Sequence, residues 1–234
     1  MIQIRKSEDR GTTDFGWLKS RHSFSFGEYY DPQHHDYGPL RVINDDRVAG
    51  GGGFPMHPHR DMEIFSYVVE GSLEHRDSLG HRARIGAGGV QRITAGRGIA
   101  HSEYNPSPTE PVHFLQIWIR PRADRLEPSY ADRHFDPAEK RNRLRPILSA
   151  DGREGSLSLA QDAVVSAAIL EPGKSLLLEV APGRRAWLQA VRGRGTLGGQ
   201  ALHAGDGASV DGPERTVLTA EEELEVLWMD LPAE

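Results

Sequence analysis

Glycine and proline recur along the whole chain, and long stretches of helical periodicity are missing. The 234 residues include 26 glycines and 15 prolines. The segments between these residues are short and apolar, and the strongest of them are Ile64–Val69 and Val112–Ile119. Short apolar runs between turn residues are typical of all-β sandwiches and barrels. We therefore expect an all-β fold built from short antiparallel strands.

The length suits one large or two small domains. Residues 122–149 are rich in Arg, Asp, Glu and Pro, and Asp136–Pro137 is typical of the start of a short capped helix. We interpret this segment as a linker with a short helix. It would separate an N-terminal barrel, residues 1–121, from a C-terminal barrel, residues 150–234. Within the first barrel, residues 22–26 predict a strand, and residues 40–48 predict a strand with a turn at Asn44–Asp46.

A weak internal repeat connects the two halves. YVVEGSL at residues 67–73 resembles LQAVRGRGTL at 188–197, and IGAGGV at 85–90 resembles LHAGDGASV at 202–210. Each member of the first pair is an apolar strand that ends in a charged residue and glycine. Chance recurrence of glycine turns is the alternative explanation. The repeat favours two copies of one β-barrel.

Composition excludes several classes of partner. Lys and Arg total 28 against 34 Asp and Glu, a formal charge of −6. This balance gives no global electrostatic reason to bind nucleic acid or anionic lipid. No apolar run is long enough to cross a bilayer, and the first residues, MIQIRKSEDRG, lack the apolar segment of a signal peptide. The absence of cysteine fits a reducing compartment, so we expect a cytoplasmic protein.

Without cysteine, a metal site must use His, Asp, Glu or water. Among the 11 histidines, His57 and His59 are two residues apart, and His101 and Glu103 repeat this spacing. On a strand, residues i and i+2 point to one face. Glu63 shares the parity of the first pair, so spacing alone leaves Glu63 and Glu103 as alternative carboxylate ligands. Imidazoles with a carboxylate suit Fe(II), Mn(II), Ni(II), Co(II), Cu(II) or Zn(II).

The other histidines give weaker signals. His34 and His35 lie in a loop that we expect to be solvated. His22 and His113 lie on predicted strands, where a hydrogen-bonded core or edge position is the default expectation. His75, His81 and His134 stand among charged residues and are expected at the surface. The second half contains His203 alone, with no cluster of carboxylates around it.

An isolated His-x-His pair is common on protein surfaces, but its context here is specific. Gly51, five residues, His57–Pro58–His59, three residues and Glu63 form one block, and Gly98, two residues, His101, three residues and Asn105 form another. These blocks resemble the two motifs of the cupin superfamily, although the glycine that closes the first, Gly71, comes one residue late and Gly96 replaces the usual proline. Longer segments extend the resemblance to the pirin family over nearly the whole chain: FSFGEYYDP (24–32), LRVINDD (40–46), GGGFPMHPHRDMEI (51–64), VVEGSLEHRDSLG (68–80), GIAHSEYN (98–105), EPSY (127–130) and SLSLAQDA (156–163).

The resemblance implies a bicupin of two antiparallel, jelly-roll β-barrels, with one divalent metal ion in the N-terminal barrel. It implies metal ligands at His57, His59, His101 and Glu103. It also implies that Glu63, at the position of the usual cupin carboxylate ligand, does not bind the metal itself but supports the residues that do. The C-terminal barrel is expected to have kept the fold and lost the metal. Fe(II) is the expected ion, with Ni, Co, Cu, Mn and Zn as alternatives.

The resemblance further implies a quercetinase-type dioxygenase that opens a flavonol ring with dioxygen, with Glu103 as the catalytic base. The alternative is a non-catalytic, redox-sensitive metal protein that regulates a transcription factor or a metabolic enzyme through a protein partner. A third reading, a sugar-phosphate isomerase or another cupin enzyme, ranks last because the pirin-like segments extend outside the metal motifs. A cavity too small for a flavonol would favour the regulator. The natural substrate, the native metal and the oligomeric state stay open at this point.

Overall fold

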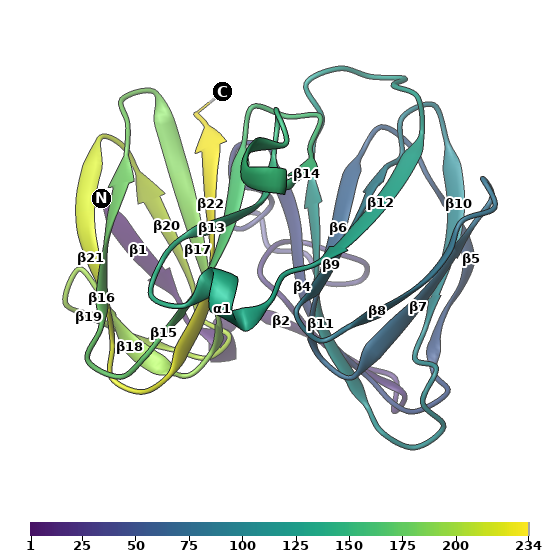
Figure 1. Ribbon diagram of the computed structural model, residues 1–234, viewed down its shortest axis with the longest axis horizontal. Coiled ribbons are helices and arrows are strands. Elements are labelled where there is room, and N and C mark those ends of the chain that lie inside the picture. Colours follow the sequence, from purple (N-terminus) through teal and green to yellow (C-terminus); the bar gives the residue numbers. More distant parts are fainter. Residues whose placement is uncertain (234) are drawn as a thin grey trace.

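The structure is a computed structural model that describes residues 1–233. Two β-sandwiches lie side by side, and each pairs a seven-stranded sheet with a four-stranded sheet (Figure 1). The prediction of an all-β bicupin is confirmed. In the first half the strands are β2 (Gly11–Asp14), β3 (Leu18–His22), β4 (Leu40–Val48), β5 (Gly53–His59), β6 (Glu63–Glu70), β7 (Ser72–Asp77), β8 (Arg82–Gly86), β9 (Gly89–Thr94), β10 (Ile99–Tyr104), β11 (Val112–Ile119) and β12 (Ser129–His134).

The second half has the same architecture. Its strands are β13 (Arg145–Ser149), β14 (Leu157–Ser158), β15 (Val164–Leu170), β16 (Ser175–Val180), β17 (Arg184–Arg192), β18 (Arg194–Leu197), β19 (Gln200–His203), β20 (Gly207–Asp211), β21 (Glu214–Ala220) and β22 (Leu224–Pro232), joined by β1 (Ile2–Arg5) from the start of the chain. The short helices are α1 (Pro137–Lys140), η1 (Ser7–Asp9) and η2 (Arg153–Gly155). The strand pairs are antiparallel, apart from the short parallel pair β13–β14.

Strand order shows that the halves are duplicates. The large sheets run β12-β9-β6-β11-β4-β3-β2 and β1-β20-β17-β22-β15-β13-β14, and the small sheets run β5-β10-β7-β8 and β16-β21-β18-β19. The β6–β7 connection therefore corresponds to the β17–β18 connection. Both turn at a glycine of positive φ, Gly71 and Gly193. A Cβ atom at Gly193 would also collide with the backbone oxygen of Glu223, which explains the glycine. The weak sequence repeat is confirmed as a structural one.

The predicted domain boundaries differ from the pairing in two places. β1, at the start of the chain, pairs with β20 of the C-terminal sheet. β12, within the segment interpreted as a linker, pairs with β9 of the N-terminal sheet, and β13 already belongs to the second half. Only α1 between them matches the predicted short helix. Its capping box is formed by Asp136, which accepts from the Ala138 amide, and by Glu139.

Two local predictions were wrong. Asn44–Asp46 is not a turn, because β4 continues through it with Asn44 opposite Gln116 and Asp46 opposite Phe114. Asn44 and Asp46 face the interior of the sandwich, whereas Asp45 faces the other side of the sheet, where it lies 2.7 Å from His113 Nε2. The strand predicted over residues 22–26 ends at His22 instead, and the chain then enters a loop.

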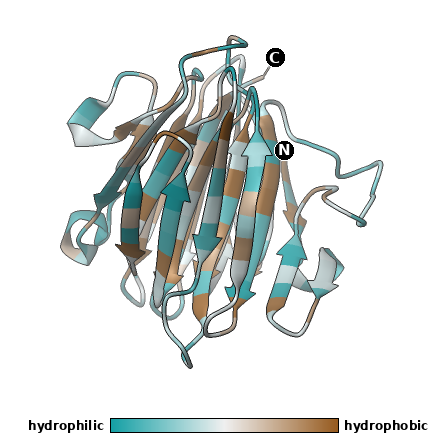
Figure 2. Cartoon of the chain, turned by 90° about the vertical axis from the view of Figure 1, so that its right-hand side faces the viewer, coloured by the Kyte–Doolittle hydropathy of each residue, from teal (hydrophilic) through white to brown (hydrophobic). Residues whose placement is uncertain are grey.

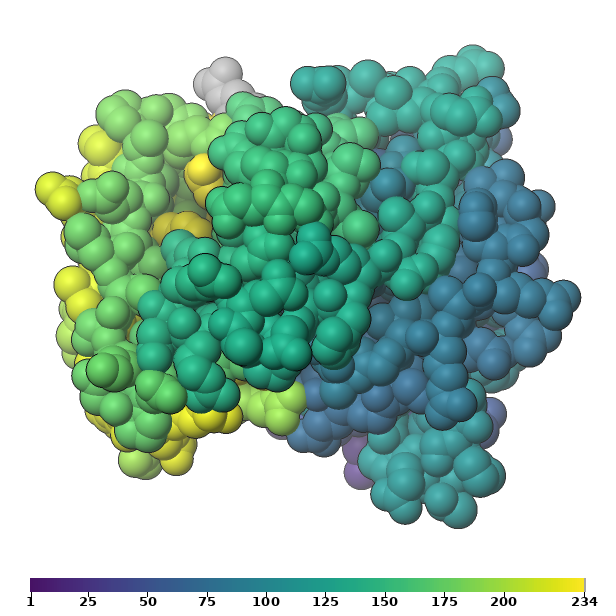
Figure 3. Space-filling model, viewed as in Figure 1, coloured from purple at the N-terminus to yellow at the C-terminus, as the bar shows by residue number. Residues whose placement is uncertain are grey.

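The outer faces of the two large sheets pack against each other and form one core across both halves. This core includes Phe65 and Leu115 from the first half and Trp187 and Leu227 from the second. The space-filling view shows the halves in contact, with the segment after residue 121 crossing between them (Figure 3). Hydrophobic and hydrophilic residues alternate along many strands, as expected where one face is buried (Figure 2). No helix in the described part of the chain is long and apolar enough to span a membrane.

Candidate metal centre

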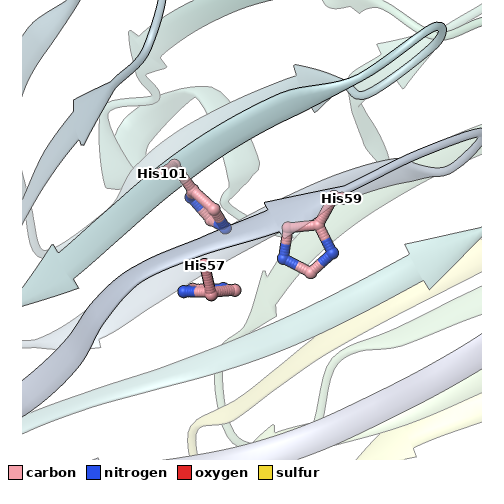
Figure 4. A group of neighbouring side chains, drawn as sticks. All are labelled: His57, His59 and His101. Carbon is pink, nitrogen blue, oxygen red and sulfur yellow. The ribbon is translucent and has the colours of Figure 1, made fainter.

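Three imidazoles converge between the sheets of the first sandwich (Figure 4). His57 and His59 lie on β5, and their side chains share a face because they are two residues apart. β10 pairs with β5 so that His101 lies directly opposite His57. The three ring centroids are 4.5–4.9 Å apart. One nitrogen from each ring lies within 4.8 Å of the other two, which brings three ligand atoms to one point.

The chemistry of this cluster fits a cation. His101 is fully buried, and neither of its ring nitrogens has a hydrogen-bond partner among the described residues. An unpartnered buried nitrogen is costly unless a ligand occupies it. The His57 Nδ1 lies 2.7 Å from the Pro55 carbonyl oxygen, so Nδ1–H donates and leaves Nε2 as the free ligand atom. Burial, with the neighbouring imidazoles, lowers the pKa of His59 and of His101 to about 3. Both rings are therefore neutral, the form that binds metals.

Glu103 is buried beside this cluster, but its oxygens are not among the atoms that converge within 4.8 Å. Its Oε2 accepts a hydrogen bond from Gln116 Nε2 at 2.7 Å. Its Oε1 accepts from Gln91 Nε2 and from Ser66 Oγ. Burial raises the pKa of Glu103. The fourth ligand therefore stays a prediction, and three side chains hold the carboxylate in place.

A cavity of about 320 Å³ lies next to the histidines. His57, His59 and Glu103 line it, together with Phe26, Phe54 and Trp118. The Trp118 ring meets the His59 ring edge-on with centroids 4.9 Å apart. Small-molecule sites are typically concave, mostly apolar and a few hundred Å³ in volume, with a few polar groups that fix orientation. The cavity has this form.

Comparison with known proteins identifies the family. Residues 3–119 match the Pirin family, and residues 146–231 match the quercetinase C-terminal cupin domain. The chain is 43% identical to a quercetin 2,3-dioxygenase of Escherichia coli K12, over 99% of both chains, and 37% identical to a pirin-like protein of Caulobacter vibrioides, over 98% of this chain and 99% of the other. The chain belongs to the pirin family.

A solved structure supports the assignment and bears on the metal. The bacterial pirin YhhW of Escherichia coli, crystallised in complex with nickel(II), superposes on this pirin with a TM-score of 0.94, with 42% sequence identity and complete coverage of both chains. The His57, His59 and His101 cluster of the present chain provides a site that can hold a metal ion. A metal-dependent cupin is therefore supported.

The resemblance implied that Glu63 supports the metal ligands, and this expectation was wrong. Alternation along β6 places Ser66 toward the metal centre and Phe65 in the core between the halves. Glu63 shares the parity of Phe65, and its Oε2 accepts a hydrogen bond from the Ala160 amide of the second half at 3.1 Å. Burial raises the pKa of Glu63. Its carboxyl group joins the two halves.

Sequence reasoning missed the polar row beneath Glu103. Strand register places one polar residue on each of five adjacent strands of the large sheet, in the order His22, Asn44, Gln116, Ser66 and Gln91. Neighbours in the row are hydrogen-bonded at His22 Nδ1 to Asn44 Oδ1, 2.7 Å, and at Ser66 Oγ to Gln116 Oε1, 2.8 Å. In the sequence, each of these residues is visible only as an isolated polar position within an apolar strand. They align into a row only through the pairing register of the strands, which the sequence alone does not reveal.

The surface prediction for His75 was wrong. This ring is fully buried, because the charged neighbours Glu74 and Arg76 occupy the opposite face of β7 while His75 faces the space between the sheets, where it meets Tyr130 of β12. His75 Nε2 lies 3.1 Å from Asp77 Oδ2, and the ring stacks on Tyr130 with centroids 4.3 Å apart. Its centroid is 5.5 Å from that of His101. His75 therefore lies beside His101 without a hydrogen bond to it.

His22 and His113 meet the default expectation for strand histidines. His22 is buried, and its Nε2 lies 2.9 Å from Thr13 Oγ1, although the ring also lines the cavity. Burial lowers its pKa. His113 Nε2 lies 2.7 Å from Asp45 Oδ1 on the opposite face of the sheet. Neither ring belongs to the three-histidine cluster.

Proposed function

We propose that this pirin is a metal-dependent dioxygenase of the quercetinase type, which opens the ring of a flavonol with dioxygen. One observation carries the proposal: three imidazoles converge at the wall of an apolar cavity of about 320 Å³. The names of its relatives as quercetin 2,3-dioxygenases support the same chemistry. The cavity volume falls within the range of small-molecule sites, which favours an enzyme over a regulator without a substrate.

The proposed ligands are His57, His59 and His101, with Glu103 as the fourth. A divalent ion held there would lower the pKa of a bound hydroxyl group and stabilise the resulting oxyanion. Fe(II) is the ion that we expect in a reducing cytoplasm, and Ni(II) is the ion reported for the bacterial pirin YhhW. Co, Cu, Mn and Zn suit the same ligand set.

The protein groups have distinct proposed roles. Phe26, Phe54 and Trp118 offer apolar and aromatic surface to a flat ring system and exclude water. Glu103 receives the proton of the flavonol hydroxyl as the catalytic base. Its raised pKa suits this role, because a stronger base accepts the proton more readily. The amide groups of Gln91 and Gln116 orient the carboxylate toward the cavity that it lines.

The test is anaerobic reconstitution of metal-free protein with each ion in turn, followed by exposure to quercetin and air. Loss of flavonol absorbance with release of carbon monoxide supports the proposal and ranks the metals. Absence of turnover with every ion would overturn it. A protein partner that is captured by the wild type and lost with His57→Ala would instead support the regulatory alternative.

A further inference from the structure

Asp46 is a buried carboxyl group that the metal centre does not use. It lies on β4, opposite Ser20 on β3 and Phe114 on β11. The residue is only 4% exposed and yet lines the cavity beside the histidines. Burial raises its pKa to about 7, with the nearby Asp45 and Glu103 acting in the same direction. A group held at this desolvation cost needs a compensating partner.

One of its oxygens has no such partner. Asp46 Oδ1 is buried and has no hydrogen bond to any described residue. Its neighbours in the cavity differ, because Asn44, Gln116 and Glu103 all have hydrogen-bonded side chains. Buried polar atoms are nearly always satisfied, and an exception inside a cavity points to a missing ligand group.

The position of Asp46 relative to the metal centre sets what that ligand group can be. Asn44 belongs to the polar row that holds Glu103, and Asp46 follows two residues along β4. This separation is about 7 Å along the strand. His57, His59 and Asp46 line one cavity, so a rigid ring system whose hydroxyl lies at the metal centre can present a second, remote hydroxyl to Asp46. A phenolic hydroxyl both donates and accepts, so it can pair with either protonation state of Asp46.

We propose that Asp46 is a specificity-determining residue, whose Oδ1 forms a hydrogen bond with a hydroxyl group of the substrate remote from the metal centre. The inference rests on the proposed function and names the substrate class as polyhydroxylated aromatics. A site built to bond a hydroxyl discriminates strongly against the analogue that lacks it, because the buried protein group is then left unpaired.

The experiment compares two ligands and four proteins. Quercetin carries several hydroxyl groups, and 3-hydroxyflavone has the same ring system with the metal-binding hydroxyl alone. Affinities for both are measured by calorimetry under argon in the metal-loaded wild type and in Asp46→Leu, Asp46→Asn and Glu63→Gln. Glu63 is the matched control, since it is also buried with an unpartnered oxygen but faces the other side of the sheet. Thermal unfolding checks the fold of each variant, and the isosteric Asp46→Asn serves if Asp46→Leu is unstable.

We expect Asp46→Leu to lose about tenfold in quercetin affinity and to bind 3-hydroxyflavone within about twofold of the wild type. Glu63→Gln should keep the wild-type preference. Equal changes for both ligands, or no change for either, would overturn the role of Asp46 and leave the proposed function standing. A wild type that binds neither ligand would overturn both. In air, the KM of Asp46→Leu for quercetin should rise by a larger factor than its KM for 3-hydroxyflavone.

Discussion

The two cupins of this pirin share one strand order and fill the space between their sheets with opposite chemistry. In the N-terminal cupin the interior holds imidazoles, a carboxylate and the polar row. In the C-terminal cupin it holds a closed apolar cluster that includes Leu178, Leu197, Leu218 and Trp228. Since the strand order survives both fillings, the fold depends on alternation and turns. The site depends on which side chains occupy the inner faces.

The strand that carries His101 corresponds to β21 in the second cupin, where Leu218 is fully buried. We therefore expect substitution of His101 to change metal binding and substitution of Leu218 to change the stability of the fold. The halves are not independent, because they share the central core and exchange β1 and β12.

The largest effect is expected for His101→Ala. This change removes one of three converging ligands. Loss of a residue that only hydrogen-bonds to a ligand already lowers metal affinity by up to about 100-fold, so we expect the loss of a ligand itself to lower it by more than that. Metal content per chain after dialysis, measured by mass spectrometry, checks it. His203→Ala is the control in the second cupin, where the ring is 56% exposed. If His101→Ala retains the metal, the centre lies elsewhere.

Leu218→Ala should have the converse effect. Truncation of a fully buried leucine leaves a cavity, and we expect the free energy of unfolding to fall by about 2–5 kcal/mol. Urea denaturation measures this loss, and metal content of the folded protein should stay unchanged. A loss of metal without a loss of stability would show that the second cupin contributes to the centre directly.

The sequence was sufficient for the elements that depend on local pattern. Alternation, glycine turns and the Asp136 cap predicted the strands, the repeat and the short helix. His57 and His59 followed from strand parity, and His101 from a motif. Spacing could not decide between Glu63 and Glu103 as the carboxylate ligand. The pairing of β10 with β5 and β7 places Glu103 between the sheets of the first sandwich. The alternation of side chains along β6 turns Glu63 to the other face, toward the second half.

Features that depend on long-range register were beyond the sequence. β1 and β12 cross to sheets that chain order does not indicate. His75 stands between charged residues in the chain, and the packing of its ring against Tyr130 of the other sheet is what buries it. Asn44 and Asp46 look like turn residues until Gln116 and Phe114 are placed opposite them.

Gln116→Leu tests whether the polar row matters to the centre. The variant keeps the volume and removes the amide that donates to Glu103 Oε2. We expect metal affinity to fall by about 10–100-fold, the effect typical of a residue that orients a ligand. Competition with a chelator measures the affinity. Gln161→Leu is the control, since this amide donates to the Arg120 carbonyl away from the centre. An unchanged affinity would argue that Glu103 is not a ligand.

Acid should weaken the metal-free N-terminal cupin through its neutral histidines. The pKa of His59 and of His101 is about 3 in the folded chain, against 6.5 when unfolded. Between these values the unfolded chain binds more protons, so stability falls as pH drops from 6.5 toward 3. From pH 7 to pH 5 the two rings should cost about 1–3 kcal/mol together, and His59, which keeps some solvent contact, contributes the smaller share.

The double variant His59→Leu, His101→Leu isolates this contribution. Asp46 acts in the opposite direction, because its raised pKa lets the folded chain bind the extra proton below pH 7, and His22 acts in the same direction as the ligands. Both effects are common to the two proteins and cancel in the difference. Urea denaturation in the presence of a chelator at pH 7, 6 and 5 should therefore give a shallower loss for the double variant. Parallel losses would mean that the rings are protonated in the folded chain, and that the neutral cluster does not distinguish the first cupin from the second.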